Sequence, residues 1–314
     1  MIQPVCRDLA QESSVVFHMA DAKKSPTPLQ VAYQAHGRRW QDFKYVYPVV
    51  SRRSGGLSVG INLNPDKACN FDCIYCQVDR STPGPTRKVE LDELRSELSC
   101  LLNEAICGRL FEVPPFDSVP AGRRKVRDLA FSGDGEPTTC PQFEEAVRLA
   151  VDARRTRGLN DAKLVLITDA CYLTKPSVRS ALQLFDENNG EIWAKLDAGT
   201  QDYCQLVNRP NYPLAHVLEN ILDAARVRPI VIQSLWMRVH GQLPPEAEVS
   251  AYCDRLNELL ICGGRLKLIQ LYTIARRTTE TYAKPLTDAE LDRLAAVVRA
   301  RVTAPVETFY GVQS

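Results

Sequence analysis

Short β-branched apolar runs alternate with amphipathic segments along this chain from about residue 57 onward. Apolar runs of this length, bounded by polar and turn residues, are typical of strands, whereas the longer segments between them have the spacing of helices. The pattern predicts strands at 57–63, 127–132, 163–168, 191–197, 229–236, 265–273 and 305–310. It predicts helices at 90–106, 141–156, 175–185, 213–226, 245–261 and 287–301.

Strands that alternate with helices in this way predict an α/β fold made of parallel βα units. Six such units suit a partial (β/α)6 TIM-like barrel better than a flat doubly wound sheet, although periodicity alone does not separate the two. Active sites of barrels lie at the C-terminal ends of their strands. The residues that end each predicted strand are therefore the place to look for chemistry.

The predicted barrel domain covers residues 45–314, and residues 1–44 are interpreted as an N-terminal extension with a short strand at 15–17. Residues 108–126 interrupt the alternation with several prolines and glycines, so this segment is expected to be a loop or an insertion. Aromatic side chains that we expect to pack against the barrel stand at Trp40, Phe43, Tyr45 and Tyr47.

Composition limits the class of protein. The 314 residues are 45% hydrophobic and 25% charged, as in soluble globular proteins. A net charge of +1 provides no overall field that attracts nucleic acid or an acidic membrane, although local basic clusters remain, such as 123–125. No apolar run reaches the ~20 residues needed to cross a bilayer, and no secretory pattern is present. With eleven cysteines, the chain is expected in the reducing cytoplasm, with thiols available to metal.

Three cysteines with the spacing C-x3-C-x2-C follow the first predicted strand, at Cys69, Cys73 and Cys76. A [4Fe-4S] cluster normally takes four thiolates, so three leave one iron open to a small molecule. A structural zinc site fits less well because it requires four ligands, and no second CxxC pair stands nearby. Two alternatives stay open at this point: a plain electron-transfer cluster, or cysteines grouped by chance.

The cysteine arrangement resembles the radical S-adenosylmethionine (SAM) superfamily. The resemblance implies a [4Fe-4S] cluster whose open iron binds SAM, and reductive cleavage of SAM to a 5′-deoxyadenosyl radical that abstracts hydrogen from a substrate. It implies that Tyr75, just before the third cysteine, packs near the adenine. It also implies an electron donor such as flavodoxin or ferredoxin, and no membrane partner.

A glycine-containing turn follows the second predicted strand, at Gly133, Asp134, Gly135 and Glu136. Glycines let a backbone pass close to a ligand, and a carboxylate accepts hydrogen bonds from an ammonium group. The turn resembles the glycine–glycine–glutamate motif of radical SAM proteins, which implies that it holds the methionyl amino group of SAM. An ordinary structural turn is the alternative.

The third predicted strand ends at Thr168 and Asp169, where polar groups can hydrogen-bond a ribose. The family often has Thr-Asn-Gly at this point, so Asp169 replaces an asparagine. In the fourth strand, Lys195 and Asp197 share one face and are the candidate catalytic residues. They form either a salt-bridged pair that positions SAM or closes the barrel, or a site where Lys195 has a lowered pKa for imine or proton chemistry.

Gln270 and Tyr272 share a face of the sixth strand and are expected either to bind the cofactor or to hydrogen-bond within the core. The cysteines outside the motif form no tight cluster, and most are expected to act as small apolar residues. A second cluster stays an alternative, with Cys140 and Cys171 nearest the predicted strand ends.

Together, these motifs and Asn208-Arg209-Pro210 resemble the wyosine-synthetase-like iron–sulfur oxidoreductases over residues 45–311. Members that make the tricyclic guanine of tRNA carry a second cluster on N-terminal cysteines, and here that region offers only Cys6. The substrate is therefore unassigned, with tRNA as one alternative. A non-catalytic electron-transfer or redox-sensing protein is the alternative from another class.

Overall fold

The computed structural model describes residues 27–34, 40–82, 84, 86 and 88–311; the strand predicted at 15–17 lies outside them. Within the described residues, eight strands form one sheet in the order β1-β2-β3-β4-β5-β6-β8-β10. β1 is antiparallel to β2, and all other neighbours are parallel. The strands are β1 (Val46–Ser51), β2 (Gly56–Ile61), β3 (Val126–Phe131), β4 (Lys163–Thr168), β5 (Gly190–Lys195), β6 (Ile230–Leu235), β8 (Leu266–Tyr272) and β10 (Val306–Phe309).

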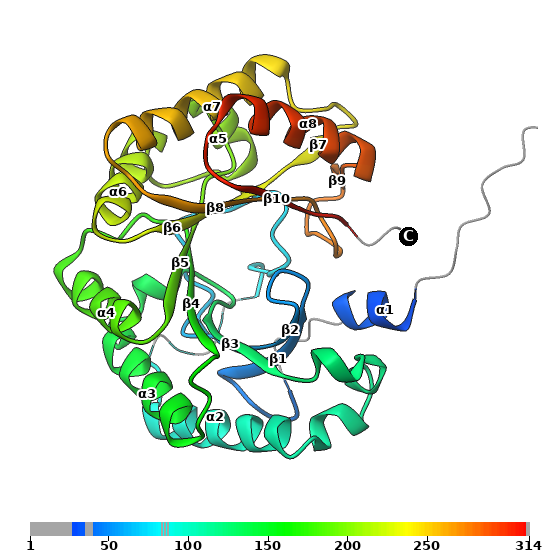
Figure 1. Cartoon of the computed structure of the whole chain (residues 1–314), viewed down its shortest axis with the longest axis vertical. Helices are drawn as coiled ribbons and strands as arrows, with labels where there is room; N and C mark the ends of the chain where they lie inside the picture. Colours follow the sequence, from blue (N-terminus) through cyan, green and yellow to red (C-terminus); the bar gives the residue numbers. More distant parts are fainter. Residues whose placement is uncertain (1–26, 35–39, 83, 85, 87, 312–314) are drawn as a thin grey trace, which may run out of the picture.

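The sheet curves into an open arc with helices on its outer side (Figure 1). Within the described part of the chain β1 and β10 do not pair with each other, so the barrel is partial. Helix α1 (Pro28–Gln34) packs against β1 beside this gap. The helices that follow the strands are α2 (Leu91–Ile106), α3 (Phe143–Thr156), α4 (Pro176–Glu187), α6 (Leu214–Val227), α7 (Glu246–Ile261) and α8 (Asp288–Arg301).

Alternation along the strands separates two apolar cores. Ala130, Val165, Trp193 and Val231 form a small cluster inside the arc. Their neighbours in sequence, such as Leu129 and Leu164, belong to a much larger core beneath the helices. Both faces of the sheet are therefore buried, which explains why the strands appear in the sequence as nearly continuous apolar runs. The predicted partial barrel and its strand–helix alternation are confirmed.

The structure also contains elements that periodicity missed. β1 was not predicted, although Tyr45 and Tyr47 are buried and Trp40 and Phe43 pack against the core, as expected. β1 holds Pro48 and lies at the sheet edge, where a strand tolerates proline. Three elements are short, so their patterns are weak: β7 (Met237–Val239), β9 (Ala283–Pro285) and α5 (Gln201–Val207).

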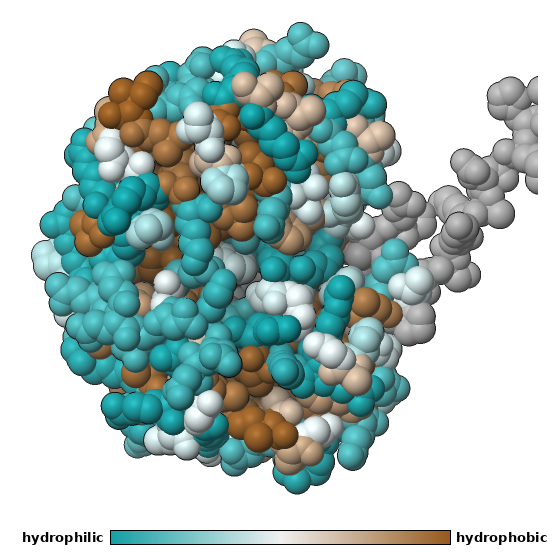
Figure 2. Space-filling model, in the orientation of Figure 1, coloured by the Kyte–Doolittle hydropathy of each residue, from teal (hydrophilic) through white to brown (hydrophobic). Residues whose placement is uncertain are grey.

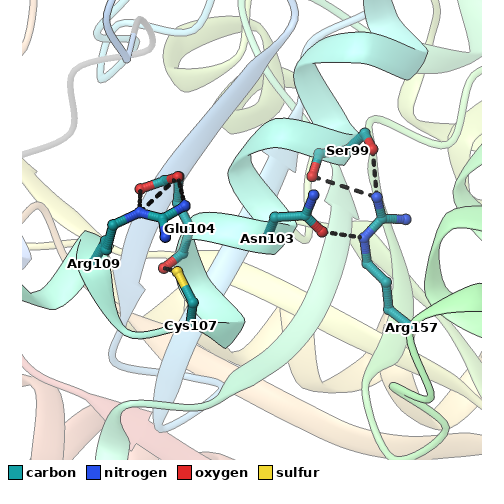
Figure 3. A network of polar contacts seen from close by, with 6 residues as sticks. All are labelled: Ser99, Asn103, Glu104, Cys107, Arg109 and Arg157. Carbon is teal, nitrogen blue, oxygen red and sulfur yellow. Dashed lines mark hydrogen bonds and ion pairs between the residues drawn. The ribbon is translucent and has the colours of Figure 1, made fainter.

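The segment predicted as a loop or insertion contains short 3-10 helices at η1 (Arg109–Glu112), η2 (Phe116–Ser118) and η3 (Ala121–Arg123). A polar network fixes the end of α2 that leads into this segment (Figure 3). Arg157, after α3, donates to Asn103 Oδ1 at 3.0 Å and to Ser99, while Arg109 pairs with Glu104.

The surface is mixed in character. On the face shown in Figure 2, hydrophilic residues surround smaller hydrophobic areas. Among the helices of the described ranges, none combines the length and the apolar character that a membrane crossing requires.

Candidate active site

The cysteine loop lies between β2 and α2 and is bound to the segment that follows α5. The backbone N–H of Asp72 donates to the Asn208 carbonyl oxygen at 3.0 Å, and that of Ile74 donates to the Val207 carbonyl oxygen at 3.0 Å. The motif Asn208-Arg209-Pro210, which the family resemblance includes, is therefore the support on which the cysteine loop rests.

Two side chains donate hydrogen bonds to cysteine sulfurs. Asn208 Nδ2 lies 3.4 Å from Cys73 Sγ, and Arg80 Nη1 lies 3.0 Å from Cys76 Sγ. Burial raises the pKa of both Cys69 and Cys73. Burial also acts to raise the pKa of Cys76, but the charge and hydrogen bond of Arg80 outweigh it, so that this pKa lies below its usual value. Donors of this kind stabilise thiolate ligands.

The glycine turn after β3 lies directly against the cysteine loop. The Glu136 N–H donates to the Ala68 carbonyl oxygen at 3.1 Å. A side chain at Gly135 would overlap that same carbonyl group, and one at Gly133 would overlap the Asn62 amide. The two glycines are therefore required by the close approach of the two loops, which is the proximity that the motifs implied.

A carboxylate network connects this turn to the end of β4. Glu136 accepts hydrogen bonds from Thr168 Oγ1 and from the Asp169 N–H, each at 2.7 Å, and from Thr138 Oγ1 at 2.5 Å. Burial and the neighbouring negative charge of Asp169 raise the pKa of Glu136 to about 8. Asp169 Oδ2 is buried and has no hydrogen-bond partner within the described residues. An unpaired buried carboxylate oxygen indicates a place for a donor that the chain itself does not supply.

Asp197 accepts three hydrogen bonds from different parts of the barrel. Its carboxylate bonds to the Tyr75 hydroxyl, to Asn208 Nδ2 at 2.8 Å and to the Leu235 N–H at 2.7 Å. The side chain is 2% exposed, so these donors replace water completely. Asp197 therefore positions Tyr75 and Asn208, and through them the cysteine loop.

Lys195 does not form the predicted ion pair with Asp197 in the described structure. Its Nζ lies 4.6 Å from the centroid of the Tyr75 ring. Burial acts to lower the pKa of Lys195, but electrostatic interactions with the ionised forms of Cys73, Tyr272 and Asp197 outweigh it, and the pKa is raised. This direction is opposite to that of the alternative with a lowered pKa, and it describes Lys195 as a positive charge beside the cysteine loop.

A cavity of about 290 Å³ joins most of these groups. Asp134, Asp197 and Gln270 do not line it. Asp134 accepts from Asn62 Nδ2 at 2.8 Å, and Gln270 accepts from Gln233 Nε2 at 2.8 Å, which matches the core alternative for Gln270. The predicted site residues that line the cavity are Cys69, Cys73, Tyr75, Cys76, Gly133, Gly135, Glu136, Thr168, Asp169, Lys195 and Tyr272.

The cavity also has charged lining residues that sequence reasoning did not assign to the site: Arg52, Arg53, Arg80, Asp128 and Arg276. Asp128 stands inside the second predicted strand, where a charged residue among apolar ones was a usable signal. Arg52 and Arg53 precede the first predicted strand, and no pattern in the sequence places them inside the arc.

The donors present fit an iron–sulfur cluster better than a single ion. Within the described residues, no three His, Cys, Asp or Glu side chains converge on one metal position. A [4Fe-4S] cluster does not require its ligands to converge on one metal position, because each cysteine binds a different iron. Three free cysteines face one cavity beside a glycine turn with no room for a Cβ, and two of them accept hydrogen bonds from side chains. Cys140 and Cys171 are free, buried members of the apolar core.

The fold is the TIM-like partial barrel of the radical SAM type, and the chain resembles the radical SAM superfamily in its motifs as in its fold. A solved structure of TYW1 with a lysine–pyruvate adduct bound shares this fold, with a TM-score of 0.51 and 14% identity, over 79% of this chain and 74% of that chain.

Among curated proteins, the UPF0026 protein MJ1312 of Methanocaldococcus jannaschii is 30% identical over 177 residues, covering 56% of this chain and 46% of that protein. A protein named GTPase Obg, from Brachyspira hyodysenteriae, is 25% identical over 268 residues, covering 83% of this chain and 34% of that protein. The chain thus spans between a third and a half of these two relatives. No protein-family model matches the chain.

Proposed function

We propose that this protein is a radical SAM enzyme in which Cys69, Cys73 and Cys76 hold a [4Fe-4S] cluster and SAM binds in the adjoining cavity. The observation that carries the proposal is the contact between the two loops: Glu136 N–H to Ala68 O at 3.1 Å, with no space for a side chain at Gly135. When bound, the cluster and SAM supply reductive cleavage of SAM to a 5′-deoxyadenosyl radical that takes hydrogen from the substrate.

The chain's own residues prepare the cavity for these groups. Asn208 and Arg80 hold two of the cysteine sulfurs in place, and Lys195 adds a positive charge that offsets the thiolates. The carboxylates of Glu136 and Asp169 face the cavity, and one oxygen of Asp169 lacks a partner within the described residues. Their oxygens supply acceptors for the ammonium group of SAM, whose positive charge favours the ionised form of Glu136 over the protonated form that burial favours.

The experiment is anaerobic reconstitution of the protein with iron and sulfide, followed by dithionite and SAM. We expect release of 5′-deoxyadenosine, measured by liquid chromatography. Cys69→Ser, Cys73→Ser and Cys76→Ser should each abolish it, whereas Cys262→Ser, at an exposed cysteine outside the motif, should not. No release from protein with a fully loaded cluster would contradict the proposal.

The same sample tests the non-catalytic alternative. If the protein is an electron carrier or redox sensor, the EPR spectrum of its reduced cluster should not change when SAM is added. If it is a radical SAM enzyme, that spectrum should change. The GTPase name of one relative offers a further class, but the chain lacks a G-x-x-x-x-G-K-[ST] phosphate-binding motif. The proposed enzyme would act in the reducing cytoplasm and receive electrons from a flavodoxin or ferredoxin. Replacing dithionite by reduced flavodoxin in the assay tests this electron donor.

A tRNA substrate stays a prediction, because a shared fold at 14% sequence identity does not indicate a shared substrate. Analysis of tRNA nucleosides from a deletion strain tests it: a missing modified guanosine supports tRNA, and an unchanged nucleoside profile removes it.

A further inference from the structure

The turn between β1 and β2 has a defined shape. The Gly55 N–H donates to the Ser51 carbonyl oxygen at 3.1 Å, and the Ser54 N–H donates to Ser51 Oγ at 3.1 Å. Gly55 has a φ of +69°, which a side chain disfavours. Arg52 and Arg53 are held between these contacts, so their backbone is positioned before any ligand arrives.

Arg53 extends from this turn into the interior of the arc. Its guanidinium carbon lies 5.4 Å from the centroid of the Trp193 ring and 5.2 Å from that of Tyr272. Two aromatic rings, from β5 and β8, therefore hold the guanidinium group between them and the cavity wall by cation–π contacts. Within the described residues Arg53 forms no ion pair; Asp128, the acidic side chain whose charge acts on it, is hydrogen-bonded to Ser58.

Arg52 lines the same cavity and, like Arg53, forms no ion pair within the described residues. Its Nη1 atom is buried with no hydrogen-bond partner in the described part of the chain. Burial, and then the neighbouring charge of Arg53, lower its pKa to about 10, so it remains a cation at neutral pH. Two adjacent cations with an unpaired buried N–H group are costly unless an anion joins them.

We propose that Arg52 and Arg53 form an oxyanion-binding subsite of this cavity, and that the substrate is a small molecule with a carboxylate or phosphate group. The proposal rests on the proposed function, whose substrate class it names. Arginine pairs bind carboxylates and phosphates through paired N–H donors, and stacking on aromatic rings preorganises them.

The size of the cavity favours a small molecule over a nucleic acid. Its volume of about 290 Å³ is at the lower end for small-molecule sites, and SAM has to enter the same space. The turn that carries the two arginines lies at the end of the arc where the parallel strands begin, and both side chains line the cavity. An anionic group bound there leaves the rest of a small substrate directed toward the cysteine loop.

The test uses cluster-loaded protein without SAM or reductant, in phosphate-free buffer, with inorganic phosphate and succinate as separate probes. Phenylglyoxal modifies accessible arginines, and mass spectrometry locates the modified ones. We expect one probe or both to slow modification of Arg52 and Arg53 at least tenfold and to leave Arg293, an exposed arginine of α8, unaffected. Protection by phosphate, by succinate or by both identifies which oxyanion the subsite accepts.

Calorimetric titration of variants gives a second measure. R52Q and R53Q should weaken binding of the protecting probe at least tenfold, R53K should weaken it less because it keeps the charge but loses the stacked plane, and R293Q should bind normally. Equal binding by R52Q, R53Q and R293Q would overturn the subsite. So would protection by tRNA alone, which would assign the arginines to nucleic acid.

The protection experiment requires no radical chemistry, so the two proposals fail separately. Release of 5′-deoxyadenosine without protection of Arg52 and Arg53 overturns the subsite alone. Protection without any release of 5′-deoxyadenosine overturns the proposed function and leaves an anion site.

Discussion

At the scale of single residues, the site depends on close contacts between loops that are far apart in the sequence. The Ala68 carbonyl group accepts a hydrogen bond from Glu136 and also occupies the space where a Cβ at Gly135 would lie. In the same way, Asn62 Oδ1 accepts a hydrogen bond from the Asp134 N–H, and the Asn62 side chain occupies the space where a Cβ at Gly133 would lie. Each glycine is thus required by a named neighbour, not by a left-handed backbone.

Gly135→Ala is expected to disrupt this contact. The added methyl group must displace the Ala68 backbone, which costs about 1–3 kcal/mol of unfolding free energy, as is usual for overpacking. Because the displaced carbonyl precedes Cys69, SAM binding to the cluster-loaded protein should weaken at least tenfold. Urea unfolding and equilibrium dialysis with SAM measure the two effects.

Gly122→Ala is the matched control. Gly122 has nothing within 4 Å of the position of an added Cβ, so that substitution should change neither quantity by a measurable amount. Normal SAM affinity in Gly135→Ala would show that the contact between the loops does not shape the binding site.

Site residues that lie close together in the sequence could be predicted well, whereas site residues that come together only through the fold could not. Cys69, Gly135 and Glu136 belong to local motifs whose resemblance to those of radical SAM proteins implies proximity to a ligand. Arg52 and Arg53 carry no such spacing. Their position depends on the turn after β1 and on rings from β5 and β8, none of which a local pattern describes.

At the scale of elements, charges at the base of the arc connect strands that are not all neighbours. Glu191 in β5 accepts hydrogen bonds from Lys163 in β4 and Lys267 in β8, each at 2.7 Å, and from Trp193 Nε1 at 2.9 Å. Burial acts to raise the pKa of Glu191, but these donors outweigh it and hold the pKa below its usual value of 4.5.

Glu191→Gln should therefore destabilise the protein in a pH-dependent way. A carboxyl group with a depressed folded-state pKa contributes stability above its unfolded pKa and loses it as the pH falls through the folded pKa. We expect the variant to be about 1–2 kcal/mol less stable at pH 7, a value kept modest because both lysines are half exposed. The difference should shrink below about pH 4.5.

Urea unfolding at pH 7 and near pH 4 measures this, with Glu219→Gln, on the exposed surface of α6, as the control. A stability difference that stays constant between the two pH values would mean that the carboxylate charge is not the stabilising feature.

The strand and helix order could be predicted because both faces of the parallel strands are buried, which leaves long apolar runs in the sequence. β1 could not be predicted, because Pro48 interrupts its apolar run and because that run continues directly from the preceding aromatic stretch. The positions of Gln270 and Asp134 could not be predicted either. For Gln270, strand alternation gives a face, but which residues on that face reach the cavity depends on how the sheet curves; for Asp134, the direction of the side chain depends on its contact with Asn62.

At the scale of the whole molecule, the cysteine loop joins three segments of the open barrel that are far apart in the sequence. β1 and β10 do not pair with each other in the described structure, so the sheet has two edges. The loop contacts the segment after α5 through Asn208, the glycine turn after β3 through Glu136, and the segment after β8 through a Thr279 N–H bond to the Cys76 carbonyl oxygen at 3.0 Å. A cluster bound to the three cysteines therefore fixes contacts on both sides of the arc.

Cluster loading should consequently stabilise the whole fold, because a ligand that binds only the folded state shifts the unfolding equilibrium. We expect the melting temperature of reconstituted protein to exceed that of the cluster-free protein by at least about 5 °C, which corresponds to roughly 3 kcal/mol for a chain of this size. Removing the cluster with a chelator under oxidising conditions should reverse the gain. Cys76→Ser should lose it and Cys262→Ser should keep it, since Cys262 is exposed and outside the motif. Identical melting of fully loaded and cluster-free protein would mean that the loop is rigid without its cluster, and that the contacts from Asn208, Glu136 and Thr279 alone order the site.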